Sequence, residues 1–153
     1  MARRTHPVTI TAEGRDKGKT FFITEMPASQ AEEWAARAIS GMARSGTDIP
    51  VELMGSGMAL LAAIGIMGIM RMRFEDLKPL LDEMFACVKF WPDPSNDIKI
   101  NLIEEHIEEV TTRVLLREEV LSLHVNFSVA AEFQKLMEAA RKKMAEPSPG
   151  TQT

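Results

Sequence analysis

Few residues in this sequence of 153 are spaced for catalysis or for holding a phosphate. Gly18-Lys19-Thr20 matches the end of the loop pattern G-x-x-x-x-G-K-[ST], but no glycine stands at the required distance before it. The dinucleotide pattern G-x-G-x-x-G does not occur, and Gly55-Ser56-Gly57 is too short for the nucleophile pattern G-x-S-x-G. We therefore expect a protein that is not an enzyme, with no catalytic residue and no cofactor.

The histidines and the cysteine argue against a metal site. His106 lies in the acidic run 104–109, but no second histidine stands one helical turn away, so at most two ligands converge there. We interpret this run as a solvated helix start, where the helix dipole favours carboxylates. Cys87, the single cysteine, cannot form an internal disulfide and has apolar neighbours, which is typical of a small core residue. His124 follows an apolar stretch, and we expect it to pack in the core or at its edge.

Composition indicates one folded domain and argues against nucleic acid as a partner. The chain is 45% apolar, and a domain of this length hides roughly 70% of its unfolded surface. Its 18 lysines and arginines are outnumbered by 22 aspartates and glutamates, so no overall positive field attracts phosphates. We expect a flexible N-terminus at 1–7 without a secretory signal, one domain at 8–145, and a disordered tail at 146–153.

Alternating apolar residues predict a small antiparallel sheet. Residues 8–12 alternate like a strand, residues 20–24 form a run rich in β-forming residues, and Gly14 and Gly18 between them allow a hairpin. Residues 88–91 and 98–102 repeat this pattern around a loop rich in proline and aspartate. This second pair predicts another hairpin, or a long loop with short flanking strands.

The first predicted helix follows Pro27. Ser29-Gln30-Ala31-Glu32 has the form of a capping box, in which the serine and glutamate side chains bond the free amides of the helix start. The apolar residues that follow recur at helical spacing, and Trp34 lies on this apolar stripe, which predicts a core position. Gly46 offers a left-handed end to the helix.

Four further helices are predicted along the chain. One begins near Pro50, and the next is capped by Asp76 and has Pro79 in its first turn. The last two cover residues 103–125 and 129–144. The sequence therefore predicts an α+β fold, in which an N-terminal β-hairpin or small antiparallel sheet packs against about five helices.

The segment 53–70 contains no charged residue and has three interpretations: a buried central helix, a partner surface, or a membrane span at the minimum length. Its four glycines and one serine weaken a membrane span relative to a leucine-rich one. A few short neighbours can hardly enclose a helix that is apolar on every side. We therefore favour contact with a partner protein or with a second copy of the chain.

Three runs together resemble a family of small phage proteins: GKTFFITEMPASQAEEWA at 18–35, RFEDLKPLLDEM at 73–84 and IEEV at 107–110. The chain is similar there to the tail assembly chaperones of long-tailed, siphovirus-like phages and prophages. The resemblance implies a protein that binds the tape measure protein and keeps it soluble until tail tube subunits polymerise around it. It also implies a cytoplasmic protein of the infected cell that is absent from the mature virion.

Partner-binding residues are inferred from pattern alone. Leu60, Leu61, Ile64 and Met67 lie on the uncharged segment, and Trp91 stands beside the proline-rich loop. Methionine suits such a surface because its flexible side chain adapts to many client side chains. The tape measure protein is the expected partner, the tail tube protein is a second candidate, and we expect a homo-oligomer. Two alternatives stay open: a structural component of the tail or head-tail connector, and a small membrane protein that spans at 53–70.

Overall fold

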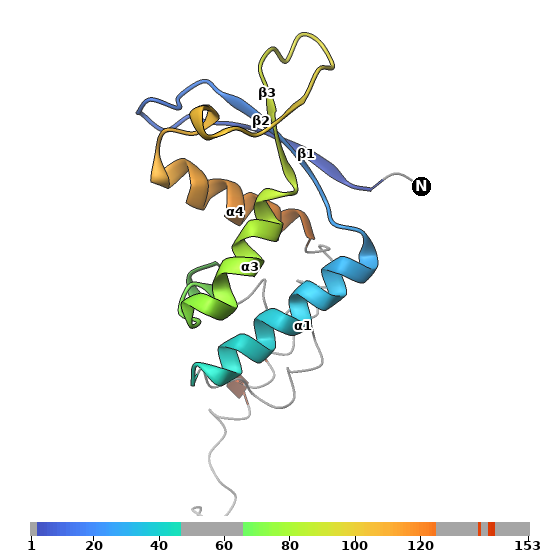
Figure 1. Cartoon of the computed structure of the whole chain (residues 1–153), viewed down its shortest axis with the longest axis vertical. Coiled ribbons are helices and arrows are strands. Elements are labelled where there is room, and N and C mark those ends of the chain that lie inside the picture. Colours follow the sequence, from blue (N-terminus) through green and yellow to red (C-terminus); the bar gives the residue numbers. More distant parts are fainter. Residues whose placement is uncertain (1–2, 47–65, 125–137, 139–140, 143–153) are drawn as a thin grey trace, which may run out of the picture.

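A computed structural model describes residues 3–46, 66–124, 138, 141 and 142. These residues form an α+β fold in which a four-stranded antiparallel sheet stands at one end and helices extend from it (Figure 1). The predicted fold class is thus confirmed. The described residues contain the helices α1, α3 and α4 and the 3-10 helix η2, in place of the five or so helices that we expected. The helix predicted from Pro50 and that predicted over 129–144 lie mainly outside the described residues.

The sheet has the order β1-β2-β3-β4, and its strands are Thr5–Thr9, Thr20–Thr24, Val88–Trp91 and Ile100–Asn101. Successive strands pair antiparallel, with Thr5 opposite Thr24, Ile23 opposite Val88 and Phe90 opposite Ile100. Both predicted hairpins are confirmed. Gly14 and Gly18 in the first loop have φ values of 144° and 88°, which L-residues rarely adopt, so the glycines are used as predicted.

β1 begins earlier than the sequence predicted. We expected a strand over 8–12 after a flexible segment at 1–7, but pairing already starts at Thr5. Arg4 extends the ladder, because its amide donates to a Glu25 carboxylate oxygen at 2.8 Å and its carbonyl accepts from the Glu25 amide at 2.9 Å. An ion pair between the same two side chains, at 3.0 Å, holds the amino end of the strand in place.

Helix α1, Ala28–Arg44, buries the predicted apolar stripe but starts in a different way. Its N-cap is Pro27, and no described side chain caps it, so the predicted capping box at residues 29–32 is wrong: Ser29 already lies inside the helix. Trp34 is only 1% exposed and donates its indole N–H to the Leu80 carbonyl at 3.1 Å, which confirms its core position. Gly46 follows the helix with φ of 85°, as predicted.

Helix α3, Phe74–Phe85, starts two residues before Asp76. Asp76 therefore lies in the first turn and is not the cap, and Pro79 lies in the second turn and not in the first. The proline side chain faces solvent, where water can hydrate the carbonyl that loses its intrahelical donor. The described residues before α3 include a helical stretch at 66–69, in which Ile66 and Ile69 are buried.

Helix α4 covers Val110–His124, so the long helix predicted from residue 103 is wrong at its beginning. The short 3-10 helix η2, Glu104–His106, occupies that stretch, and Ile107 after it is extended, with φ of −127° and ψ of 116°. The amides of Glu108 and Glu109 donate to the carboxylate of Asp16, so they bond outside the helix. This distant acceptor sets where α4 begins.

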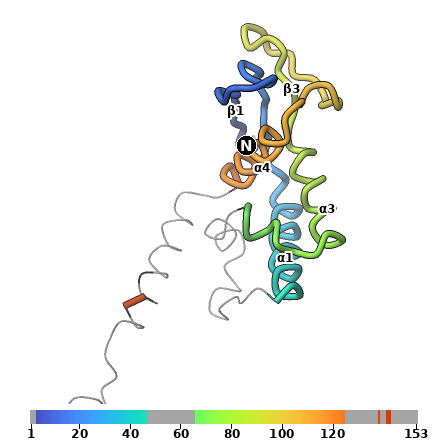
Figure 2. Tube along the Cα trace, turned by 90° about the vertical axis from the view of Figure 1, so that its left-hand side faces the viewer, coloured from blue at the N-terminus to red at the C-terminus, as the bar shows by residue number. Residues whose placement is uncertain are grey.

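The core lies between the sheet and the helices. α4 crosses beneath the sheet, while α1 and α3 pack against each other and run away from it (Figures 1 and 2). One face of the sheet contributes buried side chains to this core, and α4 packs against the sheet at β1. Among the buried residues are Val8, Ile10, Phe21, Ile23, Trp34, Ala38, Met42, Leu80, Met84, Val88, Leu116 and Val120.

Candidate functional site

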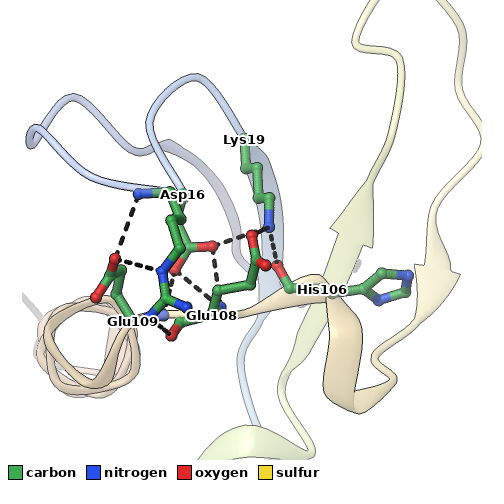
Figure 3. A network of polar contacts seen from close by, with 6 residues as sticks. Asp16, Lys19, His106, Glu108 and Glu109 are labelled. Carbon is green, nitrogen blue, oxygen red and sulfur yellow. Dashed lines mark hydrogen bonds and ion pairs between the residues drawn. The ribbon is translucent and has the colours of Figure 1, made fainter.

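The densest polar cluster joins the β1–β2 loop to the start of α4 (Figure 3). Asp16 at its centre is only 1% exposed. Its carboxylate accepts hydrogen bonds from the Lys19 ammonium at 2.9 Å, from the Glu108 amide at 3.0 and 3.1 Å, and from the Glu109 amide at 2.9 Å. Arg15 forms a second contact between the loop and the start of α4, because its Nε lies 2.9 Å from a Glu109 carboxylate oxygen.

The charge on Asp16 is stabilised despite its burial. Burial alone would raise its pKa, but the hydrogen bonds from Lys19, Glu108, Thr112 and Glu109 outweigh it and hold the pKa well below its usual range. Protein donors thus occupy both oxygens of the carboxylate, which leaves it unsuited to accept a proton from a substrate. The arrangement positions α4 under the sheet.

His106 lies beside this cluster, and its side chain packs against a neighbouring strand. Its ring stacks on Phe90 with centroids 4.2 Å apart, and its Nδ1 accepts from the Ile103 amide at 3.1 Å. Its carbonyl accepts from Lys19 at 3.0 Å. Within the described ranges, no group of three or more histidine, cysteine or acidic side chains is placed to hold a metal ion.

Cys87 and His124 lie where packing explains them. Cys87 is 9% exposed, and burial raises the pKa of its thiol to about 11, so its reactive thiolate is scarce. His124 bonds the Met26 amide through Nε2 at 2.8 Å and the Val120 carbonyl through Nδ1 at 2.7 Å. Since an amide donates and a carbonyl accepts, Nε2 accepts from Met26 and Nδ1 donates to Val120. Both residues hold elements together, as the sequence indicated.

Three large apolar side chains are exposed beside the start of α3. Met67 is 69% exposed, Met70 is 40% exposed and Phe74 is 67% exposed, whereas Ile66, Ile69 and Met72 between them are buried. We call Met67, Met70 and Phe74 the methionine patch. Met67 was a predicted partner-binding residue, and the structure makes it accessible. Leu60, Leu61 and Ile64 lie outside the described residues.

Trp91 lies elsewhere and is engaged by the β3–β4 loop and by the neighbouring strand β2. Its indole N–H donates to the Asn96 carbonyl at 2.7 Å, and its ring meets Phe22 edge-on at 5.7 Å. The Lys99 ammonium lies over both rings, 4.3 Å from the centre of Phe22 and 4.5 Å from that of Trp91. The whole of α3, about 18 Å long for its twelve residues, separates the methionine patch from this strand. The structure therefore does not bring Trp91 and Met67 to one site.

Some exposed side chains were not singled out from the sequence. Ile98, Ile100 and Ile103 are 63%, 40% and 58% exposed along the β4 edge, and Val110 at the start of α4 is 75% exposed. The alternation of Ile98 and Ile100 predicted a strand, but alternation does not tell which face stays open. The buried Asp16 was also missed, because its turn-like surroundings carry no signal of a partner far along the chain.

None of the helices formed by the described residues is both long and apolar enough to cross a bilayer. The uncharged segment that raised this possibility lies mostly outside those residues. No protein-family model, no curated protein and no solved structure matches this chain.

Proposed function

We propose that this protein is a phage tail assembly chaperone that holds an apolar, helical client, the tape measure protein, and keeps it soluble during tail assembly. The methionine patch carries this proposal. It combines an aromatic ring with two flexible thioether side chains on a surface that water reaches. Such side chains adapt to different client residues, which a chaperone for a long helical chain requires.

The surroundings of the patch support a binding role. Ile66, Ile69 and Met72 pack into the core and fix the backbone that presents Met67 and Met70. The patch is therefore a preorganised surface on a packed base, and a client does not have to order it. In the sequence, Met67 and Met70 lie at the end of the uncharged segment 53–70, and Phe74 follows it.

Co-expression with the products of adjacent tail genes tests the proposal. The tape measure protein should co-purify with the tagged wild-type chain and be lost with Met67→Glu, because the carboxylate would have to be desolvated against the client. Ile98→Glu is the matched control, since Ile98 is similarly exposed, at 63%, but lies on the β3–β4 hairpin. Capture should survive in that variant.

Two outcomes count against the proposal. Failure of the wild type to capture the tape measure protein at any of several salt concentrations contradicts the chaperone function. Detection of the chain in purified virions by mass spectrometry favours the rival function, a structural component of the tail or head-tail connector.

A further inference from the structure

The end of α3 and the start of α4 meet where two arginines share one aromatic ring. Arg113 and Arg117 are one turn apart on α4, and their guanidinium carbons lie 4.2 and 4.3 Å from the centre of the Phe85 ring. Each contact has the geometry of a cation–π interaction. The ring thus holds two like charges in place, at a position where all three side chains are partly exposed.

The two charges lack a counterion in the described structure. Arg4, Arg15, Arg37 and Arg44 each have a carboxylate oxygen within ion-pair distance. Neither Arg113 nor Arg117 pairs with a carboxylate of residues 3–46 or 66–124, and the Nε of Arg117 is buried without a hydrogen-bond partner. A buried donor without a partner is costly, so its presence calls for an explanation.

The surroundings of Arg117 disfavour its positive charge. Burial and then the charge of Arg113 lower the pKa of Arg117, which means that its surroundings disfavour its positive form. Asp82 opposes this effect from a distance, but its carboxylate is engaged by Lys78 at 2.8 Å. An incoming carboxylate would relieve the repulsion between the two guanidinium groups.

We infer that Arg113, Arg117 and Phe85 bind two carboxylates of an acidic helical segment in a partner protein. Side chains four apart on a helix have Cβ atoms about 5–6 Å apart, so two acidic residues one turn apart match the spacing of the arginines. Guanidinium groups bind carboxylates through paired hydrogen bonds. Val110, 75% exposed and three residues before Arg113, offers the partner an apolar contact on the same side of α4.

A protein segment fits this site better than nucleic acid. The chain carries a net charge of −4. The exposed Asp82 lies near Arg117 in space, and the exposed Glu118 follows Arg117 in the sequence. A nucleic acid carries a phosphate at every nucleotide, so it would bring more negative charge against those carboxylates than the two acidic side chains of one helical turn. The inference rests on the proposed function for the identity of the partner, the tape measure protein, but the site itself can be tested without that protein.

The direct test uses a model peptide of about 20 residues, long enough to form a helix, with two glutamates four apart beside a leucine. The NMR signals of the Nε–Hε groups of Arg113 and Arg117 in the full-length chain should shift when the peptide is added. The affinity should fall about tenfold or more in Arg113→Gln/Arg117→Gln, because charge-assisted hydrogen bonds are lost. Arg113→Lys/Arg117→Lys, which keeps the charge without the planar fork, should bind with intermediate affinity.

The matched control is Lys17→Gln/Lys89→Gln, which removes the same charge from exposed positions on the β1–β2 loop and β3 and should leave the affinity unchanged. The inference is overturned if a glutamine version of the peptide shifts the arginine signals equally, if the wild-type signals do not move, or if a single-stranded oligonucleotide binds more tightly. Tape measure capture separates the two proposals. Suppose that capture is lost with Met67→Glu but retained with the arginine double variant, and that the peptide does not bind. This result refutes the arginine site but not the chaperone function.

Discussion

Replacing Asp16 by asparagine should destabilise the protein strongly although the residue lies in a surface loop. The substitution turns one carboxylate oxygen into a donor, which cannot accept from the Glu108 and Glu109 amides, and it leaves the Lys19 ammonium with only its longer ion pair to Glu108, at 3.5 Å. Loss of a hydrogen-bonded, buried charge pair typically costs about 3–5 kcal/mol. That is a large part of the ~5–15 kcal/mol that stabilises an ordinary domain.

Urea unfolding followed by circular dichroism measures this loss. At neutral pH the midpoint should fall by about 2 M in Asp16→Asn, given a denaturant slope of roughly 2 kcal/mol per molar. Asp97→Asn is the matched control, because Asp97 is 95% exposed and its ion pair with Lys99 is a surface contact. Equal midpoints for the two variants would refute the argument that Asp16 fixes the start of α4.

The stability of the protein at acidic pH should show the contribution of the Asp16 carboxylate. The pKa of Asp16 is lower in the folded chain than in the unfolded one, so its contribution to stability is complete above a pH of about 4 and disappears as the pH falls through the folded-state value. The wild-type midpoint should therefore decline below that pH, and the decline should be smaller in Asp16→Asn. An identical pH profile for both proteins would show that other carboxylates carry the acid sensitivity.

Two further predictions follow from the packing. Cys87 should react with iodoacetamide at pH 8 far more slowly in the folded chain than in urea, because burial raises the pKa of its thiol to about 11, and equal rates would contradict that burial. Gly46→Ala should lower the free energy of unfolding by about 1 kcal/mol, since φ is 85° there and no neighbouring atom lies within 4 Å to compensate, and an unchanged melting temperature would contradict it.

The sheet could be predicted because its signals are local. Residues 20–24 are rich in β-forming side chains, and Gly14 and Gly18 carry the conformational freedom that the loop needs. The helix starts were less predictable. α1 has a proline as its N-cap, without side-chain capping by any described residue, and α4 begins where Asp16, 92 residues before Glu108, accepts its first amides. An acceptor at that separation leaves no trace in a window of neighbouring residues.

The candidate sites also differ in how far the sequence could predict them. Met67 could be singled out because it lies in an uncharged stretch, and its exposure then followed from the burial of Ile66 and Ile69 on the other sides of the same turn. Arg113 and Arg117 could not be singled out from the sequence. They form a candidate site only because Phe85 lies against both, and the packing of α3 on α4 brings it there. Arginines one turn apart are common on helix surfaces and normally have no partner ring.

The solubility of the tape measure protein reports on whether this chain acts as its chaperone. It should be measured by centrifuging lysates in which that protein is expressed alone, with the wild-type chain, with Met67→Glu, and with Ile98→Glu. The wild type and Ile98→Glu should keep the tape measure protein in the supernatant, whereas Met67→Glu should leave it in the pellet. Equal amounts in the supernatant with and without the wild-type chain would show that the chain is not its chaperone.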